Sequence, residues 1–204
     1  MGAMGEMQHV TTGSMKLTPE PLQGRHVRLE PLSAVHDAPL RAACDADPDI
    51  WSLYPFSMQG EHYGRWRAGV DRRVAAGEAI AFAVIVEGRC GGVTLYTTVD
   101  APNRRVEIGN TYFHPELRGG VANPESKLLL LDHAFASGAT CVQFRVDALN
   151  ARSRAAMTKL GAHLDGVLRQ DRITWTGRVR DTVIFSILTD EWSELRNRLT
   201  TRID

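Results

Sequence analysis

The sequence predicts a mixed α/β fold, built from an antiparallel meander and a later crossover helix. Three observations lead to this prediction. Residues 79–86 and 91–98 are apolar runs joined by a Glu-Gly-Arg turn, which is typical of a β-hairpin. A strand, a tight turn and a helix follow one another over residues 105–135, and residues 140–161 repeat strand and helix. The full order is β-α-α-β-β-β-α-β-α-β-β.

The first third of the chain contributes one strand and two helices to this order. Residues 26–32 alternate and predict an opening strand, and Ser33 is suited to cap a helix over residues 35–45. Residues 50–56 are rich in aromatic side chains and predict a loop. Residues 61–76 predict a second helix, because apolar side chains recur at helical spacing: Tyr63, Trp66, Val70 and Val74.

Proline, glycine and asparagine residues indicate where the central strand, the turn and the helix begin and end. Pro115 ends the strand, because proline has no N–H for the β-ladder. Gly119 and Gly120 supply a turn in which the backbone can be approached closely. Asn123 is a good N-cap for the helix, and Pro124 suits its first position.

The start of this helix is a candidate anion site. Its free N–H groups and the positive end of its dipole favour a phosphate, which the small residues before it allow to approach. The alternative is an ordinary capped turn between a strand and a helix. Neither common phosphate motif is present, because Lys127 is followed by Leu128 and no G-x-G-x-x-G occurs.

The last third of the sequence predicts a helix whose two ends are indicated by capping residues, followed by a pair of strands and a terminal helix. Asn150 is expected to cap the helix that Gly161 ends. Residues 162–173 and 183–188 predict the strand pair, and Asp190 opens the terminal helix.

Composition limits the classes of protein. The 204 residues are compatible with one domain, expected over residues 16–204, after a disordered or vector-derived tail at residues 1–15. Lys plus Arg and Asp plus Glu both total 24, so no global field favours nucleic acid or an acidic membrane. No window offers the roughly 20 apolar residues of a membrane span. The three scattered cysteines, Cys44, Cys90 and Cys141, favour a reduced, cytoplasmic compartment.

Four segments carry a family resemblance: residues 24–32, Glu107-Ile-Gly with residues 118–127, residues 150–161, and residues 166–169 with 180–192. In this order they resemble the GNAT superfamily of acyl-CoA-dependent N-acyltransferases, and most closely its RimJ/RimL-like branch. The second segment resembles the CoA-binding strand, turn and helix of that family, and the third resembles its second cofactor segment.

The resemblance implies a fold and a reaction. The fold is a mixed, mostly antiparallel, twisted sheet of about seven strands flanked by helices and splayed between the central strand and the next. In the reaction, a primary amine attacks the thioester of acetyl-CoA, or of another acyl-CoA, directly in a ternary complex. No metal is implied, and the histidines show no metal-ligand spacing.

The resemblance also implies which residues hold the co-substrate. Main-chain groups of residues 112–114 would pair with the pantetheine arm, and N–H groups of residues 119–123 would cradle the diphosphate. Val121 departs from the family pattern, because it places a Cβ where glycine normally lets the diphosphate approach. The expected cofactor-binding residues are Tyr112, Phe113, His114, Arg118, Gly119, Gly120, Val121, Ala122, Asn123, Asn150 and Ser153.

Three residues are the expected catalytic group. Glu107 would take a proton from the amine through a water, and the alternative is a structural carboxylate paired with an arginine. Ser153 would donate to the leaving thiolate, and the alternative is a serine that serves the helix start. Asn150 would cap its helix, contact the cofactor, or do both.

Other residues are weaker candidates for the active site. Trp51, Tyr54 and Phe56 lie in the loop that walls the acceptor-substrate site in this family, although aromatic loop residues are more often core. His114 and His133 are further base candidates, with an ordinary structural histidine as the alternative. The arginine-rich residues 169–180 would steer an acidic acceptor or CoA phosphates, or form a solvated hairpin.

Two classes of function follow. The first is an N-acyltransferase, expected to be an acetyltransferase, acting on a small-molecule amine or a protein N-terminus. The second is a non-catalytic acyl-CoA-binding or regulatory protein on the same fold. An interaction module that binds no CoA is a third reading. A homodimer is expected only by analogy with the family.

Overall fold

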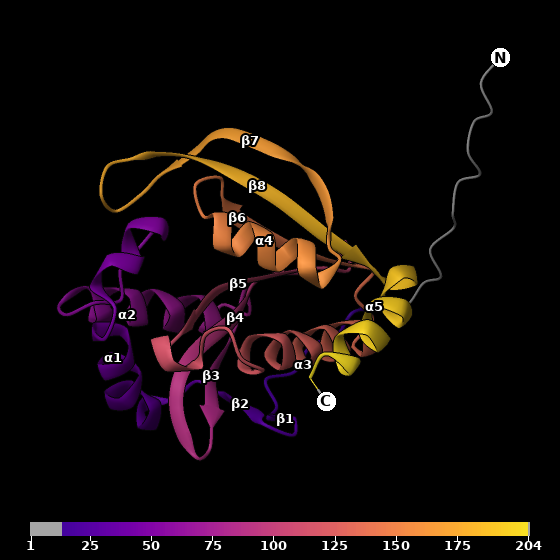
Figure 1. The fold of residues 1–204 in the computed structure, drawn as a ribbon, viewed down its shortest axis with the longest axis horizontal. Helices are drawn as coiled ribbons and strands as arrows, with labels where there is room; N and C mark the ends of the chain where they lie inside the picture. Colours follow the sequence, from indigo (N-terminus) through magenta and orange to yellow (C-terminus); the bar gives the residue numbers. More distant parts are fainter. Residues whose placement is uncertain (1–13, 204) are drawn as a thin grey trace.

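A computed structural model describes residues 14–203, and one eight-stranded sheet forms its centre (Figure 1). The strand order is β1-β2-β3-β4-β5-β6-β8-β7. The strands are β1 (Leu22–Gln23), β2 (Val27–Pro31), β3 (Ile80–Val86), β4 (Arg89–Asp100), β5 (Arg105–Phe113), β6 (Cys141–Asp147), β7 (His163–Ile173) and β8 (Val179–Leu188).

Five α-helices and three short 3₁₀ helices connect these strands within residues 14–203. The α-helices are α1 (Asp37–Asp45), α2 (His62–Ala75), α3 (Ala122–Ala136), α4 (Ala151–Leu160) and α5 (Thr189–Thr201). The 3₁₀ helices are η1 (Ala34–His36), η2 (Pro48–Leu53) and η3 (Pro115–Leu117).

The helices cover the two faces of the sheet unequally. One core cluster joins α3, α4 and α5 to the sheet through residues such as Leu130, Met157 and Leu195, and we call this side the α3 face. A second cluster joins α1 and α2 to β3, β4 and β5 through residues such as Leu40 and Trp66, and we call this side the α1 face. Burying apolar area on both faces supplies the main stabilisation of such a layered fold.

The predicted fold class is confirmed, with one more strand than expected. Every neighbouring pair is antiparallel except β5 and β6, which are parallel. The additional strand is β1, whose two residues pair with Leu29 and Arg28 of β2. Two residues are too few to show the alternation on which strand prediction depends.

The sheet opens between β5 and β6. The two strands pair only over Arg105–Glu107 and Cys141–Gln143, although β5 continues to Phe113 and β6 to Asp147. The splay expected from the family resemblance is therefore present. Beyond Glu107, one edge of β5 has no neighbouring strand to which its main-chain groups can bond.

A β-bulge in β5 changes which residues face which side. Leu95 pairs with Gly109 and Val93 with Tyr112, so β5 carries one extra residue there. Asn110 absorbs it with φ of 48°, a left-handed conformation that asparagine tolerates. Before the bulge Ile108 faces the α3 core, and after it Tyr112 faces the α1 core.

The start of α3 differs from the prediction. The helix begins at Ala122 with Val121 at the N-cap position, so Asn123 and Pro124 lie inside the first turn. Proline is tolerated there, because the first N–H groups of a helix have no intrahelical partner. Asn123 makes no capping hydrogen bond.

Buried Glu125 anchors this first turn instead. Its carboxylate accepts hydrogen bonds from the N–H groups of Arg25, at 2.6 Å, and His26, at 2.9 Å, just before β2. A Cβ at Gly24 would lie 2.6 Å from the same carboxylate, which explains a glycine at that position. The position of the α3 start therefore depends on a contact about a hundred residues away in sequence.

Two smaller expectations need correction. Residues 50–56 were expected to be a loop, but η2 covers their first part. Residues 1–15 were expected to be a tail. Residues 1–13 lie outside the described residues, whereas Met15 is buried in the α3-face core and Lys16 N–H bonds to Ser137 O at 3.0 Å. Within residues 14–203, none of the helices is long and apolar enough to span a membrane.

Candidate active site

A cavity of about 500 Å³ passes through the sheet at the opening between β5 and β6. Its lining includes Met157 and Leu160 of the α3-face core together with Tyr54 and Phe56, which pack on the α1-face core. A single space bordered by both cores must cross the sheet. The arrangement can therefore bring together two molecules that enter from opposite faces.

On the α3 face, the cavity borders the turn that leads into α3. Gly119 adopts φ of 80°, and a Cβ on Gly119 or Gly120 would meet no atom within 4 Å. The N–H groups of Gly119, Gly120 and Val121 make no hydrogen bond to the described residues. Open space in front of unused donors at a helix start fits an anion such as the diphosphate of CoA.

Val121 carries no conformational conflict in this turn. Its φ of −76° is ordinary for any residue, and the left-handed conformation falls on Gly119 instead. Val121 and Ala122 do not line the cavity, whereas Gly119, Gly120 and Asn123 do. The departure from the family pattern is thus accommodated by the local backbone.

Arg118 is held at the edge of the cavity by three contacts. Its Nε donates to Phe113 O at 2.9 Å, its Nη1 pairs with Asp47, and its guanidinium lies 5.3 Å from the centre of the Tyr112 ring. Its Nη2 is buried and without a hydrogen-bond partner among residues 14–203. This nitrogen is the part of Arg118 that remains for a ligand.

The free edge of β5 is partly occupied by side chains. Because His114 N–H bonds to Gly91 O of β4, the alternation along the strand turns the main-chain groups of Thr111 and Phe113 toward β6. Thr111 O accepts from Tyr54 OH at 2.6 Å, and Phe113 O accepts from Arg118. A pantetheine arm would therefore find N–H donors of Thr111 and Phe113 rather than acceptors of Tyr112 and His114.

Glu107 lines the cavity on the α1 face. Its neighbours Val106 and Ile108 both enter the α3-face core, so its own side chain leaves the strand on the opposite side. Within residues 14–203 its carboxylate forms neither an ion pair nor a hydrogen bond. The alternative of a carboxylate paired with arginine is therefore wrong, and Glu107 is available to a ligand or a water.

The start of α4 also borders the cavity. Asn150 caps the helix as predicted, because its Oδ1 accepts from Ser153 N–H at 2.9 Å, and Gly161 ends it in the left-handed conformation. The Ser153 hydroxyl makes no hydrogen bond to the described residues. Both residues line the cavity, so Ser153 has a hydroxyl free for a ligand while its N–H serves the cap.

Sequence reasoning missed Lys127, which is only 5% exposed and lines the cavity. Its Nζ donates to Thr111 Oγ1 at 3.1 Å and lies 5.7 Å from the centre of the Phe144 ring. Burial lowers the pKa of its ammonium to about 7. A signal existed, because Lys127 shares the buried helical spacing of Leu130, Leu131 and Ala134.

On the α1 face, the aromatic loop and the β7–β8 hairpin form a wall. Trp175 Nε1 donates to Trp51 O at 2.8 Å, and Trp175 N–H bonds to Pro55 O at 3.2 Å. Figure 1 shows the long, curved β7–β8 hairpin extending toward the side of the molecule where α1 and α2 lie. The hairpin is therefore docked at its tip, although most residues of β7 are exposed to solvent.

The three aromatic residues of the loop have different places. Tyr54 and Phe56 line the cavity, and burial raises the pKa of Tyr54 to about 12. Trp51 does not line it. Trp51 is fully buried, stacks on Tyr112 with ring centres 4.8 Å apart, and donates to Cys44 O at 3.2 Å. The structure therefore places Trp51 in the core behind the wall rather than in the cavity.

His114 and His133 lie away from the cavity lining. His114 caps η3 by accepting from Glu116 N–H at 3.4 Å. His133 contacts Tyr96 OH at 3.1 Å, and burial lowers its pKa. The structural alternative is thus favoured for both.

The cavity is strongly basic although the chain as a whole is balanced. Ten charged residues line it, and Glu107 and Asp147 are its two acids. The eight bases are Arg118, Lys127, Arg145, Arg152, Lys159, Arg172, Arg180 and Arg202. Such a concentration of one charge sign favours anionic ligands.

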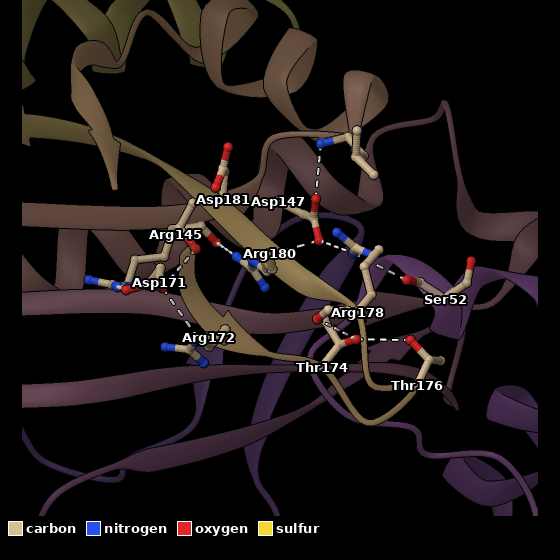
Figure 2. A network of polar contacts seen from close by, with 12 residues as sticks. Ser52, Arg145, Asp147, Asp171, Arg172, Thr174, Thr176, Arg178, Arg180 and Asp181 are labelled. Carbon is tan, nitrogen blue, oxygen red and sulfur yellow. Dashed lines mark hydrogen bonds and ion pairs between the residues drawn. The ribbon is translucent and has the colours of Figure 1, made fainter. Parts of the chain in front are cut away.

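Part of this charge forms a network between β6 and the hairpin (Figure 2). Arg145 Nη2 donates to both oxygens of Asp171, at 2.7 and 2.9 Å. Arg178 pairs with Asp147 and also reaches Ser52 O at 3.4 Å. Burial alone would raise the pKa of Asp171, but hydrogen bonds from Thr182 and Arg145 hold it below its usual range.

Comparison with known proteins agrees with this geometry. Residues 26–163, more than half of the chain, match the acetyltransferase (GNAT) domain family. A T. thermophilus structure assigned to the acetyltransferases is 32% identical, with coverage of 93% of this chain and 100% of that chain and a TM-score of 0.82. A GCN5-related N-acetyltransferase from Brucella melitensis is 26% identical, with coverage of 94% and 88% and a TM-score of 0.85.

More distant structures share the fold. RimJ from Mycobacterium smegmatis, solved in complex with CoA-disulfide, is 20% identical, with coverage of 89% of this chain and 92% of that chain and a TM-score of 0.75. No functionally curated protein sequence matches the chain significantly. Because the family model matches residues 26–163, which include both strands that border the opening, the chain belongs to the GNAT family and is an N-acetyltransferase.

Proposed function

We propose that the protein transfers an acetyl group from acetyl-CoA to a primary amine by direct attack within a ternary complex. The single observation that carries this proposal is the cavity that crosses the sheet between β5 and β6. It joins the turn with unused N–H groups on the α3 face to Glu107 on the α1 face. An acyl donor and an amine entering from opposite faces would meet at this opening.

The α3 face is proposed to hold acetyl-CoA. The unused N–H groups of Gly119, Gly120 and Val121 and the Nη2 of Arg118 fit its diphosphate. The N–H groups of Thr111 and Phe113 face the gap, where they would bind the pantetheine arm or the thioester oxygen. Donors fixed in a strand are pre-organised for a developing oxyanion.

The Ser153 hydroxyl is proposed to stabilise the leaving thiolate. It lines the cavity at the start of α4, and the capping role of Asn150 leaves it free. A hydroxyl that donates to the sulfur would lower the barrier for departure of the thiolate. Asn150 is proposed as a positioning residue, because its cap fixes Ser153.

Glu107 is proposed to receive the proton of the attacking ammonium, directly or through a water. Its position on the α1 face and its lack of a partner among residues 14–203 support this role. Lys127 is a second candidate for the same proton. Its pKa of about 7 leaves a substantial neutral fraction at neutral pH, and it lies in the same opening.

Calorimetry and a kinetic assay together test the proposal. Titration with acetyl-CoA should give saturable heat, and thiol release should depend on an added primary amine. Binding without amine-dependent release would favour the non-catalytic acyl-CoA-binding protein. Absence of binding would refute the proposal. Repeating both measurements with succinyl-CoA and a longer acyl-CoA tests the choice of acyl group.

A homodimer stays a prediction. Strand β7 is an edge of the sheet and exposes Leu164, Val167 and Leu168. Exposed apolar edge residues are suited to pairing with another chain. Light scattering on the purified protein tests this, and a monomer across the accessible concentration range would refute it.

A further inference from the structure

We propose that the acceptor amine carries an oxyanion, a carboxylate or a phosphate, which Arg180 and Arg172 of the β7–β8 hairpin bind together with Arg145 of β6. This inference rests on the proposed function and names the substrate class for it. It follows from the position of the three arginines, their incomplete neutralisation and their arrangement around the cavity.

The three arginines lie on the acceptor side of the sheet. Val146 of β6 and Val183 of β8 enter the α3-face core, so alternation places Arg145 and Arg180 on the α1 face. Arg172 is the cross-strand partner of Arg180 and shares its face. All three line the cavity. They are thus separated by the sheet from the turn proposed to hold the CoA diphosphate.

Arg180 is the most constrained of the three. It is 5% exposed, and its Nε has no hydrogen-bond partner within residues 14–203. Its Nη2 reaches Arg145 O only at 3.5 Å, and its Nε lies 3.7 Å from Asp147 Oδ2. A buried guanidinium without good hydrogen bonds is costly, so a ligand that completes them is favoured.

Asp147 does not neutralise Arg180 by itself. The same Oδ2 forms the direct ion pair with Arg178, and Oδ1 accepts from Leu149 N–H at 2.9 Å. Figure 2 shows Asp147 between the two arginines, with Arg178 on the side of Ser52. One carboxylate is therefore shared by two guanidinium groups.

The second carboxylate of the network is equally shared. Asp171 accepts from Arg145, from Thr182 Oγ1 at 2.8 Å and from Arg172 Nε at 3.3 Å. The Nε of Arg145 is also buried without a partner in the described part of the chain. Four arginines thus meet two aspartates, and the buried Nε donors of Arg145 and Arg180 remain without a partner among the described residues.

The remaining acids do not remove this excess. Asp181 leaves β8 on the opposite face, where its Oδ1 accepts from Gln170 N–H at 2.7 Å. Glu107 lines the cavity but forms no ion pair with any of these arginines. Arg172 and Arg180 are direct cross-strand neighbours, and like charges in such a pair repel. An oxyanion between them would relieve the repulsion and accept paired guanidinium hydrogen bonds.

Matched acceptor pairs test the inference by kcat/KM for amine-dependent thiol release. One set compares amino acids with their carboxamides, and another compares phosphoethanolamine with ethanolamine. Comparison of the two sets distinguishes carboxylate from phosphate. In the wild type, we expect the anionic member of at least one pair to be favoured about tenfold or more. The neutral amine of each pair measures the rate of acetyl transfer without the proposed contact between an oxyanion and the arginines.

Two variants and a control complete the test. Arg180→Met and Arg172→Gln should each reduce the ratio of kcat/KM between the anionic and the neutral member of the preferred pair to about twofold or less. Arg180 is buried, so Arg180→Met could be unstable, and thermal unfolding would reveal this. Arg172 is half-exposed, so Arg172→Gln should fold and keeps the test valid. Arg169→Gln removes an arginine from the same strand outside the cavity and should retain the preference.

The outcomes separate this inference from the proposed function. Turnover with equal kcat/KM for anionic and neutral acceptors would overturn the inference alone. A preference that survives both arginine variants would also overturn it. Absence of turnover with every amine, despite acetyl-CoA binding, would overturn the proposed function and the inference with it.

Discussion

On the α3 face, the cavity is bordered by main-chain N–H groups of one turn and by the capped start of α4. On the α1 face, it is bordered by side chains from η2, β5, β6 and the β7–β8 hairpin. The first wall relies on local capping, such as Asn150 with Ser153, although a distant contact of Glu125 also fixes the start of α3. The second depends on contacts such as Trp175 with Trp51, which are 124 residues apart.

This difference matches what each wall is proposed to recognise, acetyl-CoA on the α3 face and the acceptor amine on the α1 face. Every acyl-CoA presents the same diphosphate and pantetheine, so backbone donors suffice and almost any side chain can lie nearby. The acceptor varies among enzymes of one fold, so its wall is made of side chains on a hairpin and a loop, which tolerate changes in length and sequence. Changes on one wall should therefore leave affinity at the other unchanged.

The largest expected effect comes from the acceptor wall. Glu107→Gln should lower kcat by about 100-fold, because a positioned general base contributes on the order of that factor or more. The acetyl-CoA dissociation constant, measured by calorimetry, should stay within about twofold, because Glu107 lies on the opposite face. Weakened acetyl-CoA binding together with unchanged kcat would contradict both the role and the separation of the two walls.

Lys127 is buried beside the cavity, and its replacement by an apolar side chain should stabilise the fold. Lys127→Met removes an ammonium that the fold buries and substitutes an apolar chain of similar length. We expect a gain in the free energy of unfolding on the order of a few kcal/mol at neutral pH, where burial opposes the charge.

The pH dependence of this gain has a definite sign. The unfolded lysine titrates near 10.4, whereas the folded one has a pKa of about 7. Between these values the unfolded state binds more protons, so wild-type stability rises with pH. The advantage of Lys127→Met should be full below pH 7 and shrink toward pH 10. A constant difference across this range would contradict a lowered pKa.

The same variant distinguishes the two base candidates. If Lys127 receives the proton, the rise of kcat/KM around pH 7 should disappear in Lys127→Met and persist in Glu107→Gln. A rise around pH 7 that persists in Lys127→Met would rule out Lys127 as the group that receives the proton. Stopped-flow thiol release from pH 5 to pH 9 measures both.

A smaller effect is expected in the turn on the α3 face. Gly119→Ala forces a side chain into the left-handed conformation, which costs about 1–2 kcal/mol unless the turn rearranges. Rearrangement would move the N–H groups, so the acetyl-CoA dissociation constant should rise about tenfold. Gly120→Ala is the matched control, because Gly120 has no positive φ and open space around its Cβ. Equal effects of the two variants would argue against the proposed diphosphate site.

The smallest effect is expected at the hairpin tip. Trp175→Ala removes the hydrogen bond to Trp51 O and should raise KM for the acceptor several-fold by loosening the wall. Acetyl-CoA affinity should not change. Ile173→Ala, at a 72% exposed position of the same hairpin, should leave KM unchanged. An altered acetyl-CoA affinity in Trp175→Ala would show that the walls are coupled.

Local signals in the sequence determined most of the fold. Asn150 and Gly161 mark the two ends of α4, because a cap hydrogen bond and a left-handed residue are encoded within a few positions. The alternation of β6 and the proline after β5 likewise needed no long-range information. The same local segments, taken in order, carried the family resemblance that the domain match confirms.

Only the tertiary structure decided which residues meet in the cavity. The bulge at Asn110 separates Ile108 from Tyr112 onto opposite faces, and no local pattern marks it. Trp51 and Tyr54 are three residues apart, yet one is in the core and the other in the cavity. Lys127 and the arginines of β6 and β8 acquire their roles from strand pairing across tens of residues. The surroundings of a side chain are set by packing between elements that are distant in sequence. No local pattern reveals that packing before the whole sheet has formed.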